Sequence, residues 1–119
     1  MNTTASITIE DGRVTIRPVE GNVWLTQHQI AVLFEVFIAK VNANIRSILK
    51  SEVLRENEVC CHQKTPNGSI MTLYSLEMIT ALAFRLNSRP AQQFRRWIVR
   101  QAVNPVVLWA IPGMESQLN

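Results

Sequence analysis

The segment WLTQHQIAVLFEVFIAKVNANIRSI, residues Trp24–Ile48, decides which fold the sequence predicts. Thr26 is followed three residues later by Gln29, a capping box in which each side chain binds the backbone N–H of the other residue. Apolar residues then recur with helical spacing as far as Phe34. We therefore predict a helix that begins after Thr26 and ends near Phe34.

A second helix is expected over residues 38–50, because its apolar residues repeat with a helical period. One face is apolar and collects Ile38, Val41, Ile45, Ile48 and Leu49. The opposite face carries lysine, arginine and small residues, and no acid. Two helices joined by a short turn are the core of a helix-turn-helix motif. We place Ile38 on the core face of the second helix.

Two β-hairpins flank this helix pair in the sequence pattern. The first covers residues 6–17 and turns at Asp11-Gly12, a strong hairpin signal. The second joins residues 59–64 to 69–74 through the turn Thr65-Pro66-Asn67-Gly68. The polar residues 54–58 are expected to be a link without regular structure.

Two further helices are predicted after the second hairpin. The first, capped by Ser75, runs from Leu76 to about Leu86 and is apolar nearly all round, so it should be the most buried element. The other follows Asn87-Ser88-Arg89-Pro90 and ends near Val103. The expected fold is a single α+β domain over residues 1–119. It combines a hairpin (6–17), a winged helix-turn-helix-like unit (24–74), two helices (75–103) and an apolar tail (104–119).

The distribution of charge favours a polyanionic partner. The formal net charge is only +3, but residues 78–113 contain no acid and five arginines. A local excess of this kind is typical of proteins that bind DNA or RNA, although a solvated helix face gives the same pattern.

Binding of double-stranded DNA would place the second helix in the major groove, with Gln27 on a phosphate across it. Asn42 could then pair with an adenine edge and Arg46 with a guanine edge, although Asn42 and Asn44 also fit plain surface polarity. The arginines of the region Arg85–Arg100 could neutralise phosphates, and Arg95, Arg96 and Arg100 could instead cover the rim of the core with their aliphatic stems. The candidate DNA-binding residues are Gln27, Lys40, Asn42, Arg46, Lys50, Lys64, Arg89, Arg95, Arg96 and Arg100.

Four stretches of the chain resemble the virulence protein RhuM family. They are Trp24–Phe34, Tyr74–Ile79, Arg85–Ser88 and Gln93–Trp97, the last two being similar to the family's R-V-N-S and Q-F-R-x-W. The resemblance extends over roughly residues 14–103. It implies a bacterial, DNA-binding and regulatory module, with an N-terminal helix-turn-helix, of mobile-element or phage-related origin.

The chain departs from that family at the turn between the two helices. Glu35 stands where the family usually has glycine, at a position that often takes a positive φ. Phe37 and Ala39 replace side chains that would bond bases or phosphates, although both could touch a thymine methyl group. The alternative is a protein–protein interaction module that keeps the winged-helix fold and has lost DNA reading.

The tail leaves two interpretations open. Asn104-Pro105 should stop the last helix, and apolar residues around Trp109 follow it. They could form a homodimer contact, which would suit palindromic DNA, or fold back on the monomer.

Other functional classes find little support in the sequence. There is no phosphate-binding glycine loop and no catalytic motif, so we expect neither an enzyme nor a cofactor. Cys60-Cys61-His62 lacks the ligand spacing of a zinc site, and free thiols fit a cytoplasmic protein. The N-terminus does not resemble a signal peptide, and no apolar run approaches the ~20 residues that span a bilayer.

Overall fold

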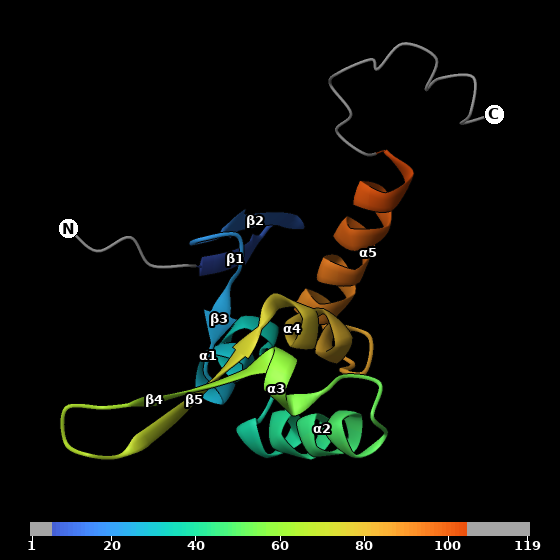
Figure 1. The fold of residues 1–119 in the computed structure, drawn as a ribbon. Coiled ribbons are helices and arrows are strands. Elements are labelled where there is room, and N and C mark those ends of the chain that lie inside the picture. The colour runs from blue at the N-terminus through green and yellow to red at the C-terminus, as the bar shows by residue number, and fades with distance from the viewer. Residues whose placement is uncertain (1–5, 105–119) are drawn as a thin grey trace, which may run out of the picture.

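Two small antiparallel sheets and five helices make up residues 6–104, the part of the chain that the computed structural model describes (Figure 1). In chain order they are β1 (Ser6–Glu10), β2 (Arg13–Arg17), β3 (Trp24–Leu25), α1 (Gln27–Phe34), α2 (Ile38–Lys50), α3 (Glu56–Val59), β4 (Cys60–Lys64), β5 (Ile70–Ser75), α4 (Leu76–Ala83) and α5 (Arg89–Val103). The expected α+β class is confirmed. None of these helices is long and apolar enough to cross a membrane. The expected tail contact around Trp109 lies outside the described residues.

The first sheet is the predicted hairpin of β1 and β2. Asp11 and Gly12 both have positive φ, 52° and 76°, which is the requirement of the tight turn that the Asp-Gly pair predicted. The two strands pair over their full length, and Ile7 and Val14 are buried beneath them. This hairpin packs against α1 and α5 (Figure 1).

Helix α1 begins and ends as its sequence predicts. Thr26 Oγ1 accepts a hydrogen bond from the backbone N of Gln29 (3.1 Å), and Gln29 Oε1 accepts one from the backbone N of Thr26 (2.8 Å). The helix ends at Glu35, which adopts the left-handed conformation with φ 55° and ψ 49°. The expected positive φ in this turn is confirmed, and a glutamate occupies it.

Helix α2 has the predicted bounds, and Val41, Ile45 and Ile48 are buried as expected. The placement of Ile38 on the core face was wrong, because its side chain is 48% exposed. Ile38 is the first residue of α2. The buried residues of α2 begin at Val41. The apolar repeat of α2 therefore starts one turn before the helix packs against the core.

The second sheet has the strand order β3-β5-β4 and includes an element that the sequence did not predict. Trp24 and Leu25 form a short strand that pairs with Ser75 and Tyr74 at the end of β5. The prediction of an irregular link over residues 54–58 was also wrong, since the turn of helix α3 begins at Glu56. Burial of Val59, at the end of α3, explains why this polar segment folds back onto the domain.

Helix α4 lies at the centre of the core. Met78, Ile79, Leu82 and Ala83 are fully buried, which confirms the expectation that this helix is the most buried element. It ends at Ala83, three residues earlier than predicted. The hydroxyl of Ser75 makes no capping bond, and Asn22 Oδ1 instead accepts from the backbone N of Leu76 at 3.2 Å.

Replacing Glu35 with glycine should stabilise the domain. A side chain at φ 55° costs about 1–2 kcal/mol, and glycine avoids most of this cost at the expense of a more flexible unfolded chain. We expect Glu35→Gly to raise the free energy of unfolding by about 1 kcal/mol, measured by urea denaturation. Glu35→Ala is the matched control, because it removes the charge and keeps the strain. Equal stability of the two variants would contradict this explanation.

Candidate nucleic-acid interface

The outward face of α2 is basic and accessible. Lys40, Ala43, Arg46 and Lys50 are all exposed, on the side of the helix opposite Val41 and Ile45. Helix α2 contains no acidic residue, so nothing on it offsets these three cations. This face therefore presents positive charge beside small side chains that allow close approach of a partner.

A chain of hydrogen bonds connects α2 to the start of α1 and to β5. The Nδ2 atom of Asn42 donates to Gln27 Oε1 (3.2 Å), and Gln27 Nε2 donates to the hydroxyl of Tyr74 (3.3 Å). Gln27, expected on a phosphate, is thus engaged inside the domain and orients Asn42. One hydrogen on Nδ2 and the Oδ1 atom of Asn42 remain for a ligand, as pairing with an adenine edge requires.

Asn44 differs from Asn42 although both belong to α2. Its Nδ2 atom donates to the carbonyl oxygen of Lys40 in the same helix, at 2.9 Å. This is a local side-chain-to-backbone bond of the kind that surface polar residues form. Of the two interpretations left open by the sequence, surface polarity therefore suits Asn44.

A shallow hollow lies at the N-terminal end of α2. Gln27, Ile38, Ala39, Asn42, Ala43 and Arg46 line it. Next to it, Phe37 is 86% exposed. The apolar residues that replace base-reading side chains are therefore on the surface, where a thymine methyl group or an apolar protein side chain could contact them.

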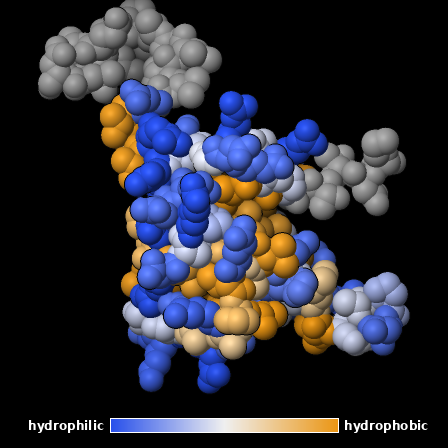
Figure 2. Space-filling view, turned by 180° about the vertical axis from the view of Figure 1, so that it is seen from behind, coloured by the Kyte–Doolittle hydropathy of each residue, from blue (hydrophilic) through white to orange (hydrophobic). Residues whose placement is uncertain are grey.

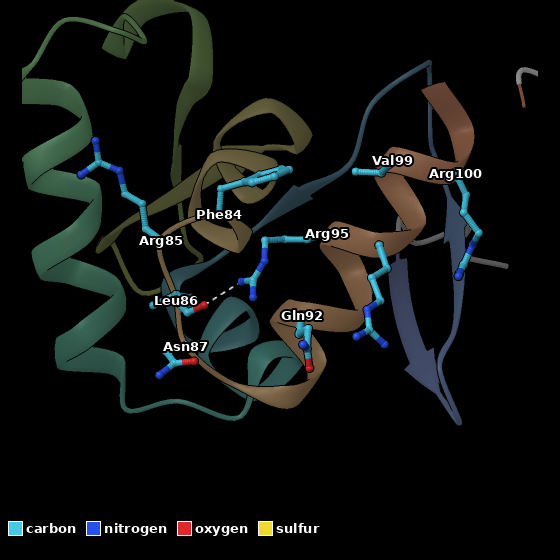
Figure 3. Close-up of a pocket in the computed structure, with 9 residues that line it drawn as sticks. Phe84, Arg85, Leu86, Asn87, Gln92, Arg95, Val99 and Arg100 are labelled. Atoms are coloured by element: carbon cyan, nitrogen blue, oxygen red, sulfur yellow. Dashed lines mark hydrogen bonds between the residues drawn. The ribbon is translucent and has the colours of Figure 1, made fainter. Parts of the chain in front are cut away.

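Arg85 was expected to contact phosphates as the first residue of the basic region 85–100, but it was not among the individual candidates. Its Nη1 atom donates to Ser47 Oγ at 3.0 Å, which brings the segment after α4 to the edge of α2 (Figure 3). The sequence showed the positive charge of Arg85 but not its place, because the contact joins residues 38 positions apart. Arg85 therefore adds a cation to one side of the α2 face.

Arg95 has a structural partner rather than an open surface. Its Nη1 atom donates to the carbonyl oxygens of Ala83 (2.6 Å) and Leu86 (2.9 Å), the second of which is drawn in Figure 3. These carbonyls lie at and just beyond the C-terminal end of α4, where a cation is favoured by the helix dipole. Arg95 thus connects the end of α4 to α5.

The remaining predicted cations are spread over other parts of the domain. Lys64 is exposed at the end of β4, beside the hairpin turn. Arg89 lines a depression together with Asp11 and Glu35, two carboxylates that reduce its attraction for phosphate. Arg96 and Arg100 belong to α5, which α4 separates from α2 (Figures 1 and 3). The structure thus groups the cations of α2 with Arg85 and places the α5 arginines on another flank.

The cysteine pair forms the start of β4 and has no features of a reactive or metal-binding site. Burial raises the pKa of the Cys60 thiol, and the nearby Glu56 carboxylate raises it further, so the thiol stays protonated at neutral pH. His62 lies 3.6 Å from the Glu56 carboxylate and 3.0 Å from Thr72 Oγ1. Across residues 6–104, no group of three or more histidine, cysteine or acidic residues is arranged to hold a metal ion.

No protein-family model matches the chain, and comparisons with curated proteins and with solved structures also find no match.

Arg95→Ala should destabilise the domain, because it removes two charge-assisted hydrogen bonds to carbonyls at and just beyond the end of α4. We expect a loss of about 1.5–3 kcal/mol in the free energy of unfolding, measured by urea denaturation. Arg96→Ala is the matched control. The Arg96 side chain is exposed, so its loss should change the free energy of unfolding by less than about 0.5 kcal/mol. The assignment of Arg95 to a structural role would be contradicted by equal stability of the two variants.

Proposed function

We propose that this chain is a winged helix-turn-helix module that binds duplex DNA and places α2 in the major groove. The observation that carries the proposal is the order of elements around α2. Strand β3 precedes α1 and α2, and the hairpin of β4 and β5 follows them and pairs back onto β3. This is the order of a winged helix, in which the first helix supports the second and the hairpin forms the wing. The resemblance to the RhuM family supports the same function.

The shape and charge of α2 suit the major groove. Its 13 residues span about 20 Å, and a groove about 12 Å wide admits a helix. Ala39 and Ala43 keep the exposed face narrow, so the helix backbone can approach the bases closely. Asn42, held by Gln27, is the residue best placed to recognise an adenine edge.

A set of five cations would contact the phosphates on both sides of that groove. Each of these cations is exposed on the α2 face, exposed on the wing, or hydrogen-bonded to the edge of α2. The set is Lys40, Arg46, Lys50, Lys64 and Arg85. The set omits Arg89, which lies beside two carboxylates, and Arg95, which binds backbone carbonyls. It also omits Arg96 and Arg100, because they belong to α5 and not to α2 or the wing.

Binding of duplex DNA should weaken steeply with salt. Five phosphate contacts predict that the logarithm of the association constant falls with the logarithm of salt concentration at a slope of about −4.5. Arg46→Ala with Lys50→Ala should reduce that slope to about −2.7, since two contacts are lost. Fluorescence anisotropy of a labelled duplex library, titrated at several salt concentrations, measures both values.

The matched control is Arg96→Ala with Arg100→Ala, which removes the same charge from α5. This variant should keep the slope of the unmodified chain. Absence of binding at low salt would overturn the proposed function. An equal change of slope in both double variants would overturn the assignment of α2 as the DNA-contacting helix.

A protein–protein interaction module is the second candidate, and the exposed residues at the start of α2 favour it. Phe37 and Ile38 are 86% and 48% exposed, and apolar side chains of this size are typical of partner surfaces. Under this alternative the duplex titration stays flat even at low salt, while α2 keeps its fold. The salt titration therefore distinguishes the two functions.

A further inference from the structure

A groove runs between the segment that follows α4 and one side of α5. It is about 860 Å³ in volume, and its lining comes from residues 84–87 and from one side of α5 (Figure 3). Arg85, which lines one end of the groove, reaches Ser47 of α2, whereas α5 rises away from α2 toward its C-terminal end (Figure 1). A duplex on the outward face of α2 would therefore leave the part of the groove along α5 accessible.

The groove combines an apolar surface with positive charge. Phe84 and Val99 line it and are 54% and 53% exposed, and Val103 lies one helical turn beyond Val99 with 69% exposure. Figure 2, which views the molecule from behind, shows hydrophobic atoms along the outer edge of α5 beside hydrophilic ones. The exposed arginines Arg96 and Arg100 also line the groove. Among the residues described, no carboxylate lines it.

The wall of the groove is held in place before any ligand binds. Arg95 lines it and donates to the carbonyl oxygens of Ala83 and Leu86, so it joins α5 to the segment that carries Phe84. A preformed site loses less conformational entropy when a partner binds than a site that must be assembled. Arg95 is therefore a positioning residue, and the ligand-facing groups are Phe84, Val99, Arg96 and Arg100.

We propose that this groove binds a short acidic amphipathic helix of a partner protein. Apolar side chains of the partner would cover Phe84 and Val99, and carboxylates beside them would pair with Arg96 and Arg100. The lining residues on α5 run from Gln92 to Arg100, about 12 Å of helix, which matches about two turns of a bound helix. A phosphate backbone would satisfy the arginines but would leave the two apolar side chains exposed to water, so an acidic peptide fits the groove better than nucleic acid.

The proposal goes beyond DNA binding and does not depend on it. With both surfaces in use, the domain would connect a DNA site on α2 to a protein on α5. Arg85 lies where the two surfaces meet, but Arg46 and Lys50 do not line the groove and Arg96 and Arg100 belong to α5, so substitutions at these pairs can disable each surface independently.

The test uses the full chain and a fluorescein-labelled helical peptide of about 15 residues, the length at which isolated helices begin to form. The peptide carries leucines with helical spacing along one face and glutamates on either side. Two matched peptides replace either every glutamate with glutamine or every leucine with alanine. We expect the acidic leucine peptide to bind at least about tenfold more tightly than either control in an anisotropy titration.

Charge-reversal variants locate the binding site. Arg96→Glu with Arg100→Glu should weaken binding of the acidic leucine peptide by at least about tenfold, because like charges then face each other. Arg46→Glu with Lys50→Glu makes the same change in net charge on α2 and should alter binding by less than about twofold. Circular dichroism of both variants checks that the fold is kept.

Four results would overturn the proposal. The first is equal affinity for all three peptides, and the second is equal weakening by the two charge-reversal variants. The third is peptide binding that appears only after Trp109→Asp. That result would mean that the tail of the unmodified chain, and not a partner protein, fills the groove. The fourth is a homodimer in light scattering that Arg96→Glu with Arg100→Glu dissociates, which would make a second copy the occupant.

Discussion

Burial of Phe34 against Phe94 fixes the arrangement on which both surfaces depend. The two rings are fully buried and meet edge to face, with centroids 5.7 Å apart. Phe34 is the last residue of α1, so this contact fixes the end of α1 against α5. The chain must then reverse direction at once, and Glu35 does so in the left-handed conformation before α2 begins. The position of α2 thus follows from a packing contact that lies outside α2.

Local signals predicted the elements that are specified by neighbours in the sequence. The capping box at Thr26, the Asp-Gly turn of the first hairpin and the bounds of α2 depend on residues a few positions apart. Two features that depend on distant residues were missed, strand β3 and the N-terminal cap of α4. Strand β3 exists because Trp24 pairs with Ser75, and the first backbone N–H of α4, at Leu76, donates to Asn22 Oδ1, 54 residues away. No local sequence pattern predicts either contact.

The candidate site follows the same division. Helical spacing predicted that Lys40, Arg46 and Lys50 would share an exposed face, because periodicity alone determines the faces of a helix. Charge alone could not separate the arginines that follow Phe84, since it carries no information about their partners. Arg85 reaches Ser47 on α2, whereas Arg95 binds the carbonyls at the end of α4. These two hydrogen bonds give two arginines of one basic segment different partners, Arg85 on α2 and Arg95 at the end of α4.

The central claim is that DNA contacts α2 and not the basic groove on α5. Its most direct test is a ¹H–¹⁵N NMR titration of the labelled full chain with a short duplex at low salt, after the backbone amides are assigned. The account predicts that the largest shift changes occur from Lys40 to Lys50 and near Lys64, with small changes from Arg96 to Val103. Shift changes confined to α5 and the groove, with α2 unaffected, would contradict it.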